Sequence, residues 1–217
     1  MADPLESKVQ IKDFEGFSDY QSIFTLMKSF SDSRDFDSDD ELWVLQFNPV
    51  YTLGAAGDPK HVLNPKQIPV IRTNRGGQVT YHGPGQIVVY PLLNLHRKNL
   101  FVKEYVNLIE ESVIDTLKLI GIPNAQRMPG APGVYVPNSD NSLSKIASLG
   151  IKVTKGFSYH GFALNVDMDL SPFLGINPCG YEHLKVIDIK TIASNCKIDK
   201  IKFVLIERLL SRLKLLK

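Results

Sequence analysis

Cysteine is scarce in this chain of 217 residues. The only two are Cys179 and Cys196, and they do not form a C-x-x-C pair. This excludes a disulfide-built scaffold and a cysteine-rich zinc module. The expected location is therefore the reducing cytoplasm, where a cysteine is a free thiol rather than half of a disulfide.

Long apolar runs and a large net charge are missing as well. The net charge is +2, too small to attract nucleic acid or an anionic membrane surface. No apolar run reaches the length of a membrane-spanning helix. The first eight residues have neither the apolar core of a secretory signal nor the arginine-rich, acid-poor composition of a transit peptide. We therefore expect neither nucleic acid nor membrane as a partner.

What remains is ordinary globular composition, with 43% hydrophobic and 22% charged residues. The length suits one domain over residues 1–217, with a monomer as the default state. Hydrophobic periodicity and turn signals predict an α+β fold with a mixed or antiparallel sheet flanked by helices. The predicted helices cover 18–30, 102–120 and the end of the chain from about 199, and the predicted strands cover 42–47, 70–71, 87–93, 134–136, 145–154 and 157–166.

Several boundaries of these elements follow from local signals. Ser18 and Gln21 have the spacing of a capping box at the start of the first helix. The segment 31–40 is rich in Ser and Asp and is predicted as a loop, and 51–65 as a mobile, turn-rich stretch. A polar hairpin loop is expected over 137–144.

The segment Arg75–Gln86 (RGGQVTYHGPGQ) is the most informative part of the chain. It contains four of the 15 glycines, together with Arg75, His82 and Pro84. Glycine permits positive φ and lets the backbone approach a bound molecule closely. A predicted strand follows at once, so the segment reads as a binding loop attached to a rigid sheet. The alternative, a double turn whose glycines serve geometry alone, does not explain Arg75 and His82.

Cys179 is the candidate nucleophile, because Pro178 and Gly180 place its thiol on a turn. The alternative is that it is a small buried hydrophobic residue; Cys196 has no supporting context. A free cysteine has a pKa of about 8.5 and is mostly protonated at pH 7, so a nucleophilic thiol needs a base or a cation nearby. The candidates for this partner are His82, His160, His183 and Lys145.

Lys145 stands out by its position in a predicted strand. Alternation puts it on the same face as Ala147, Leu149, Ile151 and Val153. A partly buried lysine would have a lowered pKa and would exchange protons with a thiol or hold it as an ion pair. The alternative is that Lys145 begins the strand and extends its amine into water.

The histidines are weaker candidates. On the strand 157–166, alternation puts His160 on the same face as Phe162, Leu164 and Val166, and a hydrogen-bonded histidine at a sheet edge is the simpler interpretation. A zinc site built from His82, His160, Cys179 and His183 is conceivable, but their spacing matches no metal signature. We therefore expect no metal.

Three blocks of sequence together resemble one family, the octanoyl-[acyl-carrier-protein]:protein N-octanoyltransferases of lipoate biosynthesis. The blocks are Arg75–Gln86, Lys145–Gly150 (KIASLG), and Gly161–Asn165 (GFALN) running on to Pro178-Cys179-Gly180, and they occur in the order of the family. The resemblance spans about residues 40–190. It implies the biotin/lipoate protein ligase fold and a Cys–Lys dyad at Cys179 and Lys145.

The resemblance also implies a substrate site and partners. The implied substrate contacts are Arg75, Gly76, Gly77, Gln78, Val79, Thr80, Tyr81, His82, Ser148, Leu149, Gly150, Gly161, Phe162 and Ala163. The implied reaction moves an octanoyl group from octanoyl-acyl carrier protein to a lysine of a lipoyl domain, through a cysteine thioester and without a cofactor. The acceptor is a 2-oxoacid dehydrogenase E2 domain or the glycine cleavage H protein, and which of the two stays open.

Three other functions compete with this one. An ATP-dependent lipoate or biotin ligase on the same fold would form an adenylate and need no nucleophilic cysteine. A non-catalytic module that holds acyl groups or lipoyl domains would tolerate loss of Cys179. A papain-type hydrolase needs a Cys–His pair with an orienting Asn, and no histidine here lies in a recognisable block of that kind.

Overall fold

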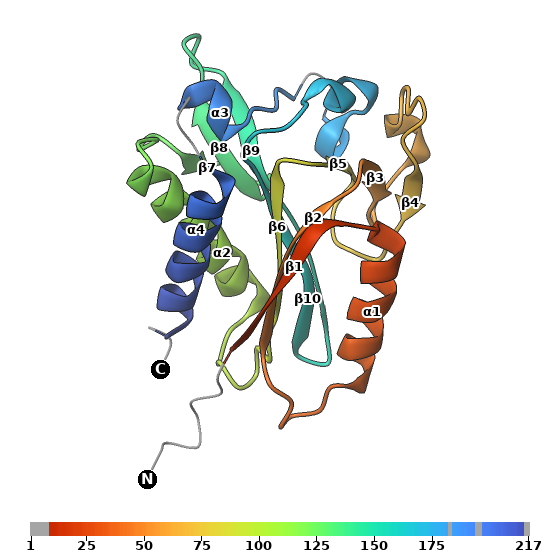
Figure 1. Cartoon of the computed structure of the whole chain (residues 1–217), viewed down its shortest axis with the longest axis vertical. Helices are drawn as coiled ribbons and strands as arrows, with labels where there is room; N and C mark the ends of the chain where they lie inside the picture. Colours follow the sequence, from red (N-terminus) through yellow and green to blue (C-terminus); the bar gives the residue numbers. More distant parts are fainter. Residues whose placement is uncertain (1–8, 182–183, 194–196, 215–217) are drawn as a thin grey trace.

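Seven strands form the central sheet, in the order β1-β2-β6-β10-β9-β8-β7 (Figure 1). The computed structural model describes residues 9–181, 184–193 and 197–214. Strands β1 and β2 pair in parallel and the other neighbours are antiparallel, so the sheet is mixed, as predicted. The strands are β1 (Gln10–Ser18), β2 (Glu41–Phe47), β6 (Gln86–Leu92), β7 (Gln126–Arg127), β8 (Gly133–Pro137), β9 (Leu143–Thr154) and β10 (Phe157–Asn165).

Helices cover both faces of this sheet (Figure 1). Helix α1 (Tyr20–Ser33) packs on one face, where Met27 and Trp43 belong to an aromatic-rich core. Helices α2 (Val102–Leu119) and α4 (Ile198–Lys214) pack on the other, where Val113 and Leu205 belong to an aliphatic core. Full burial of each such side chain stabilises the fold by about 1.5–3 kcal/mol, so the two cores hold the sheet between the helices.

A second, smaller sheet lies beside the first and carries the glycine-rich segment. It has the order β4-β3-β5, with β3 (Val50–Leu53), β4 (Val70–Arg72) and β5 (Val79–His82). Strand β5 is followed, after a short turn, by β6 of the central sheet, so Arg75–Gln86 connects the two sheets. The remaining short helices are η1 (Pro59–His61), η2 (Ser171–Gly175), η3 (Pro178–Gly180) and α3 (Ile189–Ile192).

The long predicted elements are confirmed. The helices predicted over 18–30, over 102–120 and from about 199 are α1, α2 and α4, and the hairpin turning at Lys155-Gly156 is β9–β10. The stop signal after the second helix is also correct, since Gly121 adopts a positive φ of 92° directly after α2. Hydrophobic periodicity was sufficient here because each element packs one face on a core.

Four local predictions are wrong or incomplete. The cap of α1 is Asp19, whose carboxylate accepts a hydrogen bond from the Ser22 N–H at 2.8 Å, so Ser18 and Gln21 form no capping box. The same helix runs to Ser33, into the predicted loop over 31–40. The stretch 51–65 begins with most of the buried strand β3. Strand β1 was not predicted, because it is a largely exposed edge strand with a register shift near Gly16 and no alternating pattern.

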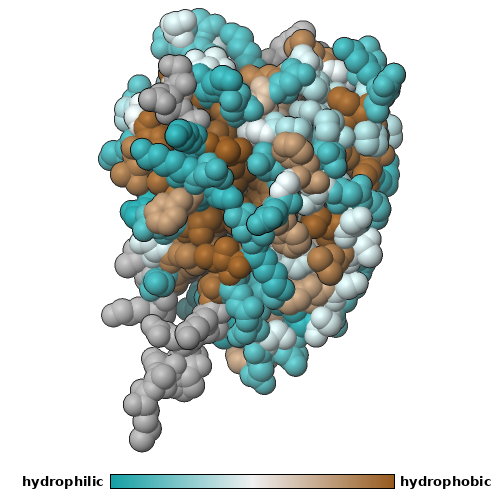
Figure 2. Space-filling model, in the orientation of Figure 1, coloured by the Kyte–Doolittle hydropathy of each residue, from teal (hydrophilic) through white to brown (hydrophobic). Residues whose placement is uncertain are grey.

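Figure 2 shows hydrophobic residues reaching the surface over α4 and beside β1. Ile11 on β1 and Phe203 on α4 are among the exposed large side chains. Among the described residues, however, no helix combines the length and hydropathy needed to cross a membrane.

Candidate active site

Arg75 organises the glycine-rich segment. Its guanidinium is buried and donates hydrogen bonds to the Thr52 hydroxyl and carbonyl at 3.0 and 2.6 Å, to Gly76 O at 2.9 Å and to Gln78 O at 2.6 Å. Burial lowers the pKa of Arg75, yet its ordinary value is so high that the group stays charged. Arg75 therefore ties β3 to the turn that precedes β5, and most of its N–H groups are used within the protein.

Lys145 lies on the opposite face of β9 from the one predicted. Val134 pairs with Ala147 and Tyr135 with Lys145, which leaves Ile146 as an extra residue in the strand. Ile146 and Ala147 both belong to the aliphatic core. This β-bulge reverses the alternation, so Lys145 does not share the face of Ala147, Leu149, Ile151 and Val153.

The Lys145 side chain is nevertheless buried, at 3% exposure. Its backbone is held on two sides. It pairs with Tyr135 of β8, and its N–H donates a hydrogen bond to Lys185 O at 2.8 Å. Its amine lies 5.2 Å from the centre of the Tyr135 ring. Lys145 is thus fixed in position, and the alternative of a frayed strand end reaching into water is wrong.

The sulfur of Cys179 lies 3.1 Å from the Lys145 Nζ. Cys179 is at the centre of η3 with a φ of 58°, in the left-handed region. A residue with a side chain in such a backbone conformation costs about 1–3 kcal/mol, and strain of this kind clusters at functional sites. Two residues 34 positions apart in the sequence therefore form a close pair. Within the described ranges, the Lys145 amine is the side-chain hydrogen-bond partner of the Cys179 sulfur.

The electrostatics of this pair differ from the prediction. Burial acts to lower the pKa of Lys145, but the negative charge of the Cys179 thiolate, together with Tyr135, outweighs burial, and the pKa ends above its ordinary value. The predicted lowering is therefore wrong in direction. Lys145 therefore stays an ammonium at neutral pH, and its charge faces the Cys179 sulfur at 3.1 Å.

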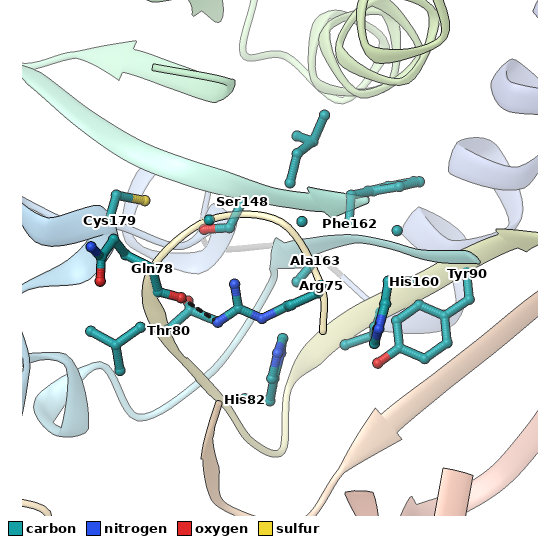
Figure 3. Close-up of a pocket in the computed structure, with 16 residues that line it drawn as sticks. Arg75, Gln78, Thr80, His82, Tyr90, Ser148, His160, Phe162, Ala163 and Cys179 are labelled. Carbon is teal, nitrogen blue, oxygen red and sulfur yellow. Dashed lines mark hydrogen bonds between the residues drawn. The ribbon is translucent and has the colours of Figure 1, made fainter. Parts of the chain in front are cut away.

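A narrow cavity runs from Cys179 into the molecule. Figure 3 shows Cys179 at one end, Tyr90 and His160 at the other, and Arg75 and Ala163 between them. Most of the predicted contact residues line it, namely Arg75, Gly77, Gln78, Val79, Thr80, His82, Ser148, Leu149, Gly150, Gly161, Phe162 and Ala163. Gly161 lets β10 approach β6, because a Cβ there would lie 2.0 Å from Val89 O.

Two predicted contact residues lie elsewhere, and three lining residues were not predicted as contacts. Tyr81 packs against Tyr51 and Phe173 in a separate core and is not part of the lining of the cavity. Gly76 lines a neighbouring cavity. The unpredicted residues are Val88, Tyr90 and His160. The apolar run 87–93 contained Val88 and Tyr90, but a fully buried strand has no alternation that marks the residues facing a ligand.

Both histidines in the cavity are buried and neutral at pH 7. Burial lowers the pKa of His82 to about 4, and its Nδ1 is paired with Gln86 Oε1 at 2.7 Å. Burial lowers the pKa of His160 to about 3, and its Nε2 is paired with Asn74 Oδ1 at 2.7 Å. Such groups are poor bases for a thiol at neutral pH.

The position of His160 also corrects the strand prediction. Its φ of 55° interrupts the regular strand conformation, and its ring stacks on Phe24 of α1. It therefore lies on the α1 side of the sheet, whereas Phe162 and Leu164 belong to the aliphatic core on the other side. His183 and Cys196 lie outside the described residues. Within the described ranges, no group of three or more His, Cys, Asp or Glu could hold a metal ion.

The chain has the fold of the biotin and lipoate protein ligases, as predicted. A bipartite lipoate protein ligase of Thermoplasma acidophilum superimposes with a TM-score of 0.73 at 14% identity, covering 95% of this chain and 85% of that one. The biotin protein ligase of Aquifex aeolicus superimposes with a TM-score of 0.55 at 11% identity, covering 96% and 70%.

Sequence comparison narrows the class. An octanoyltransferase of Bordetella petrii is 53% identical over 195 residues, which are 89% of this chain and 92% of that protein. One from Xanthomonas campestris pv. campestris is 48% identical over 209 residues, 96% and 87% of the two chains. Residues 19–210 match the lipoyl protein ligase A/B catalytic domain. The chain belongs to this family, and its near relatives are octanoyltransferases, which are acyltransferases.

Proposed function

We propose that this protein transfers an octanoyl group from octanoyl-acyl carrier protein to a lysine of a lipoyl domain, with Cys179 as the nucleophile. The observation that carries the proposal is the 3.1 Å contact between Cys179 Sγ and Lys145 Nζ at the mouth of an apolar cavity. Octanoyltransferase relatives at about half identity support the same reaction. Because a reactive thiol is required, the reaction belongs in the reducing cytoplasm.

In the first half-reaction, the Cys179 thiolate attacks the carbonyl carbon of the octanoyl thioester. Backbone N–H groups of the Gly77–Gln78 turn, beside Cys179, stabilise the oxyanion. The C–S bond to the carrier breaks, and the leaving thiolate takes a proton from the Lys145 ammonium. The products are a free carrier thiol, an octanoyl thioester on Cys179 and a neutral amine at Lys145. One thioester replaces another, so the step needs no ATP.

In the second half-reaction, the neutral Lys145 amine takes a proton from the incoming lysine ammonium of the lipoyl domain. The resulting amine attacks the thioester carbonyl and loses its second proton to water. The Cys179 thiolate leaves, which restores the pair with the Lys145 ammonium. The two half-reactions share one acyl-enzyme, so ping-pong kinetics are expected.

The cavity suits a saturated chain better than a polar one. Leu149, Phe162 and Val88 supply apolar walls, and the glycines of the segment leave room beside them. His82 and His160 are uncharged, and the charged Arg75 guanidinium directs most of its N–H groups to Thr52, Gly76 and Gln78 within the protein. The carrier is acidic and would dock on basic residues near the mouth. Of the basic residues Arg72, Arg97, Lys98 and Lys103, Arg97 and Lys98 are the poorer candidates, because both pair with the buried Asp40.

The intact mass of the protein after incubation with octanoyl-acyl carrier protein tests this proposal. We expect a gain of one octanoyl group without ATP, located on Cys179 and absent from Cys179→Ser. Addition of a lipoyl domain should then discharge the adduct and leave the octanoyl group on its lysine. An adduct that needs ATP and free octanoate, or one that persists in Cys179→Ser, would favour a ligase mechanism instead.

A further inference from the structure

A second cavity meets the first at Cys179. It has a volume of about 290 Å³ and lies between the glycine-rich segment, the segment Gly130–Pro132 and helix α2. The two cavities share Gly77, Gln78, Leu149, Gly150 and Cys179 as lining residues. The sulfur is therefore at a junction, with the first cavity, proposed for the acyl chain, on one side and this second cavity on the other.

We propose that the second cavity binds the pantetheine arm of the thioester donor. This rests on the proposed function, in which the octanoyl chain fills the first cavity. The two substituents of a planar thioester extend in opposite directions from its C–S bond. With the acyl chain directed toward Tyr90 and His160, the thiol arm must leave Cys179 on the other side, where the second cavity lies.

The lining of the second cavity matches the chemistry of such an arm. Apart from Cys179, Lys145 is the only charged residue of its lining among the described residues, and most of the other walls are aliphatic side chains and glycine-containing backbone. Val106, Leu149 and Ile151 provide apolar surface for methylene and methyl groups, and the backbone walls offer peptide groups to the two amides of the arm. Its volume is close to the lower end of ligand pockets, about 300 Å³.

The position of Lys145 supports the same assignment. Lys145 lines the second cavity but does not belong to the described lining of the first. Its ammonium thus faces the side on which the carrier sulfur leaves. The proton that this sulfur needs is available where the C–S bond breaks, and the acyl cavity stays free of charge from this amine.

Helix α2 provides a variant and a matched control. Val106 lines the second cavity, and Val102, one turn earlier, is 49% exposed and lies outside it. Acylation of Cys179 is measured with two donors that share the octanoyl group, octanoyl-pantetheine and p-nitrophenyl octanoate, of which only the first has an arm. The readout is the ratio of kcat/KM for the pantetheine donor to that for the aryl ester.

In Val106→Phe we expect this ratio to fall about tenfold, because the added ring overfills the slot. In Val102→Phe the ratio should stay within about twofold of the wild type. General misfolding of Val106→Phe would lower both rates and leave the ratio unchanged, so a second variant is needed. Tyr181→Ala removes a wall residue that is 50% exposed, and it should raise KM for octanoyl-pantetheine more than KM for the aryl ester.

Two results would overturn the assignment while leaving the proposed function intact. One is an unchanged donor ratio in both Val106→Phe and Tyr181→Ala, with Cys179 still acylated. The other is an unchanged donor ratio with slower discharge of the acyl-enzyme by a lipoyl domain, which would assign the cavity to the acceptor lysine. If neither donor acylates Cys179 in the wild type, the proposed function itself fails.

Discussion

Gly133 leaves the space that the Lys145 side chain occupies. A Cβ at residue 133 would lie 2.5 Å from Lys145 Cε and 2.8 Å from Ala147 O, and Gly133 has a φ of 142°. Contacts this short cannot be accommodated without moving the lysine, because the other neighbour is backbone. The first residue of β8 therefore determines where the amine opposite Cys179 can lie.

Replacing Gly133 with Ala should separate Lys145 from Cys179. We expect iodoacetamide to alkylate Cys179 about tenfold more slowly at pH 7, since the thiolate loses the cation that faces it. Gly121→Ala is the control, because Gly121 also has a positive φ of 92° but no atom within 4 Å of the added Cβ. Equal alkylation rates in the two variants would mean that Gly133 does not control the contact between Lys145 and Cys179.

Lys145→Arg and Lys145→Met should separate the two roles assigned to the amine. Arginine keeps a positive charge near the sulfur but does not release its proton near neutral pH. We expect Lys145→Arg to retain much of the alkylation rate of Cys179 and to lose octanoyl transfer about 100-fold, the range of general acid–base catalysis. Lys145→Met should lose both. Transfer at the wild-type rate in either variant would remove Lys145 from the mechanism.

The sequence predicted the fold and the proximity of Lys145 to Cys179, but not the geometry that joins them. Helices α1, α2 and α4 and the β9–β10 hairpin repeat their hydrophobic residues at regular intervals, so local pattern was enough. The pairing of Lys145 with Cys179 came from resemblance to a family. Strand alternation predicted the wrong face for Lys145, because a bulge depends on how β9 pairs with β8 and leaves no mark in β9 itself.

The far end of the cavity that begins at Cys179 could also not be predicted from local pattern. Tyr90, on β6, is brought beside His160, on β10, only by the order of strands in the sheet. The role of Gly133 has the same origin, because its contact is with a side chain twelve residues later on a neighbouring strand. Each of these features depends on which distant segments pair with one another, and composition and periodicity carry no information about that pairing.

Arg75 should act through the glycine-rich segment rather than through direct contact with substrate alone. Lysine cannot reproduce the hydrogen bonds to Thr52, Gly76 and Gln78, so Arg75→Lys leaves buried carbonyls without partners, at about 1–3 kcal/mol each. We expect a lower urea midpoint together with slower acylation. Arg72→Lys, at an exposed position, is the control. Slower acylation with unchanged stability would assign Arg75 to the substrate instead.

Stability should decrease as the pH falls below about 6.5, the ordinary pKa of histidine. Burial lowers the pKa of His82 to about 4 and that of His160 to about 3, so in the folded protein both rings resist protonation. Between the ordinary pKa and these values the unfolded chain binds more protons than the folded chain. The free energy of unfolding is therefore highest above pH 6.5 and declines toward pH 4, with His82 alone contributing on the order of 3 kcal/mol.

Urea unfolding at pH 7.5 and pH 4.5 measures this loss, followed by the fluorescence of the buried Trp43, the one tryptophan in the chain. Carboxylates also titrate in this range, so the comparison that isolates the histidine is between the wild type and His82→Asn. The variant should be less stable at pH 7.5, because its site is altered, yet lose less stability on acidification. The exposed His96→Asn serves as the control. If His82→Asn loses as much stability between the two pH values as the wild type, the buried ring is not the source of the acid sensitivity.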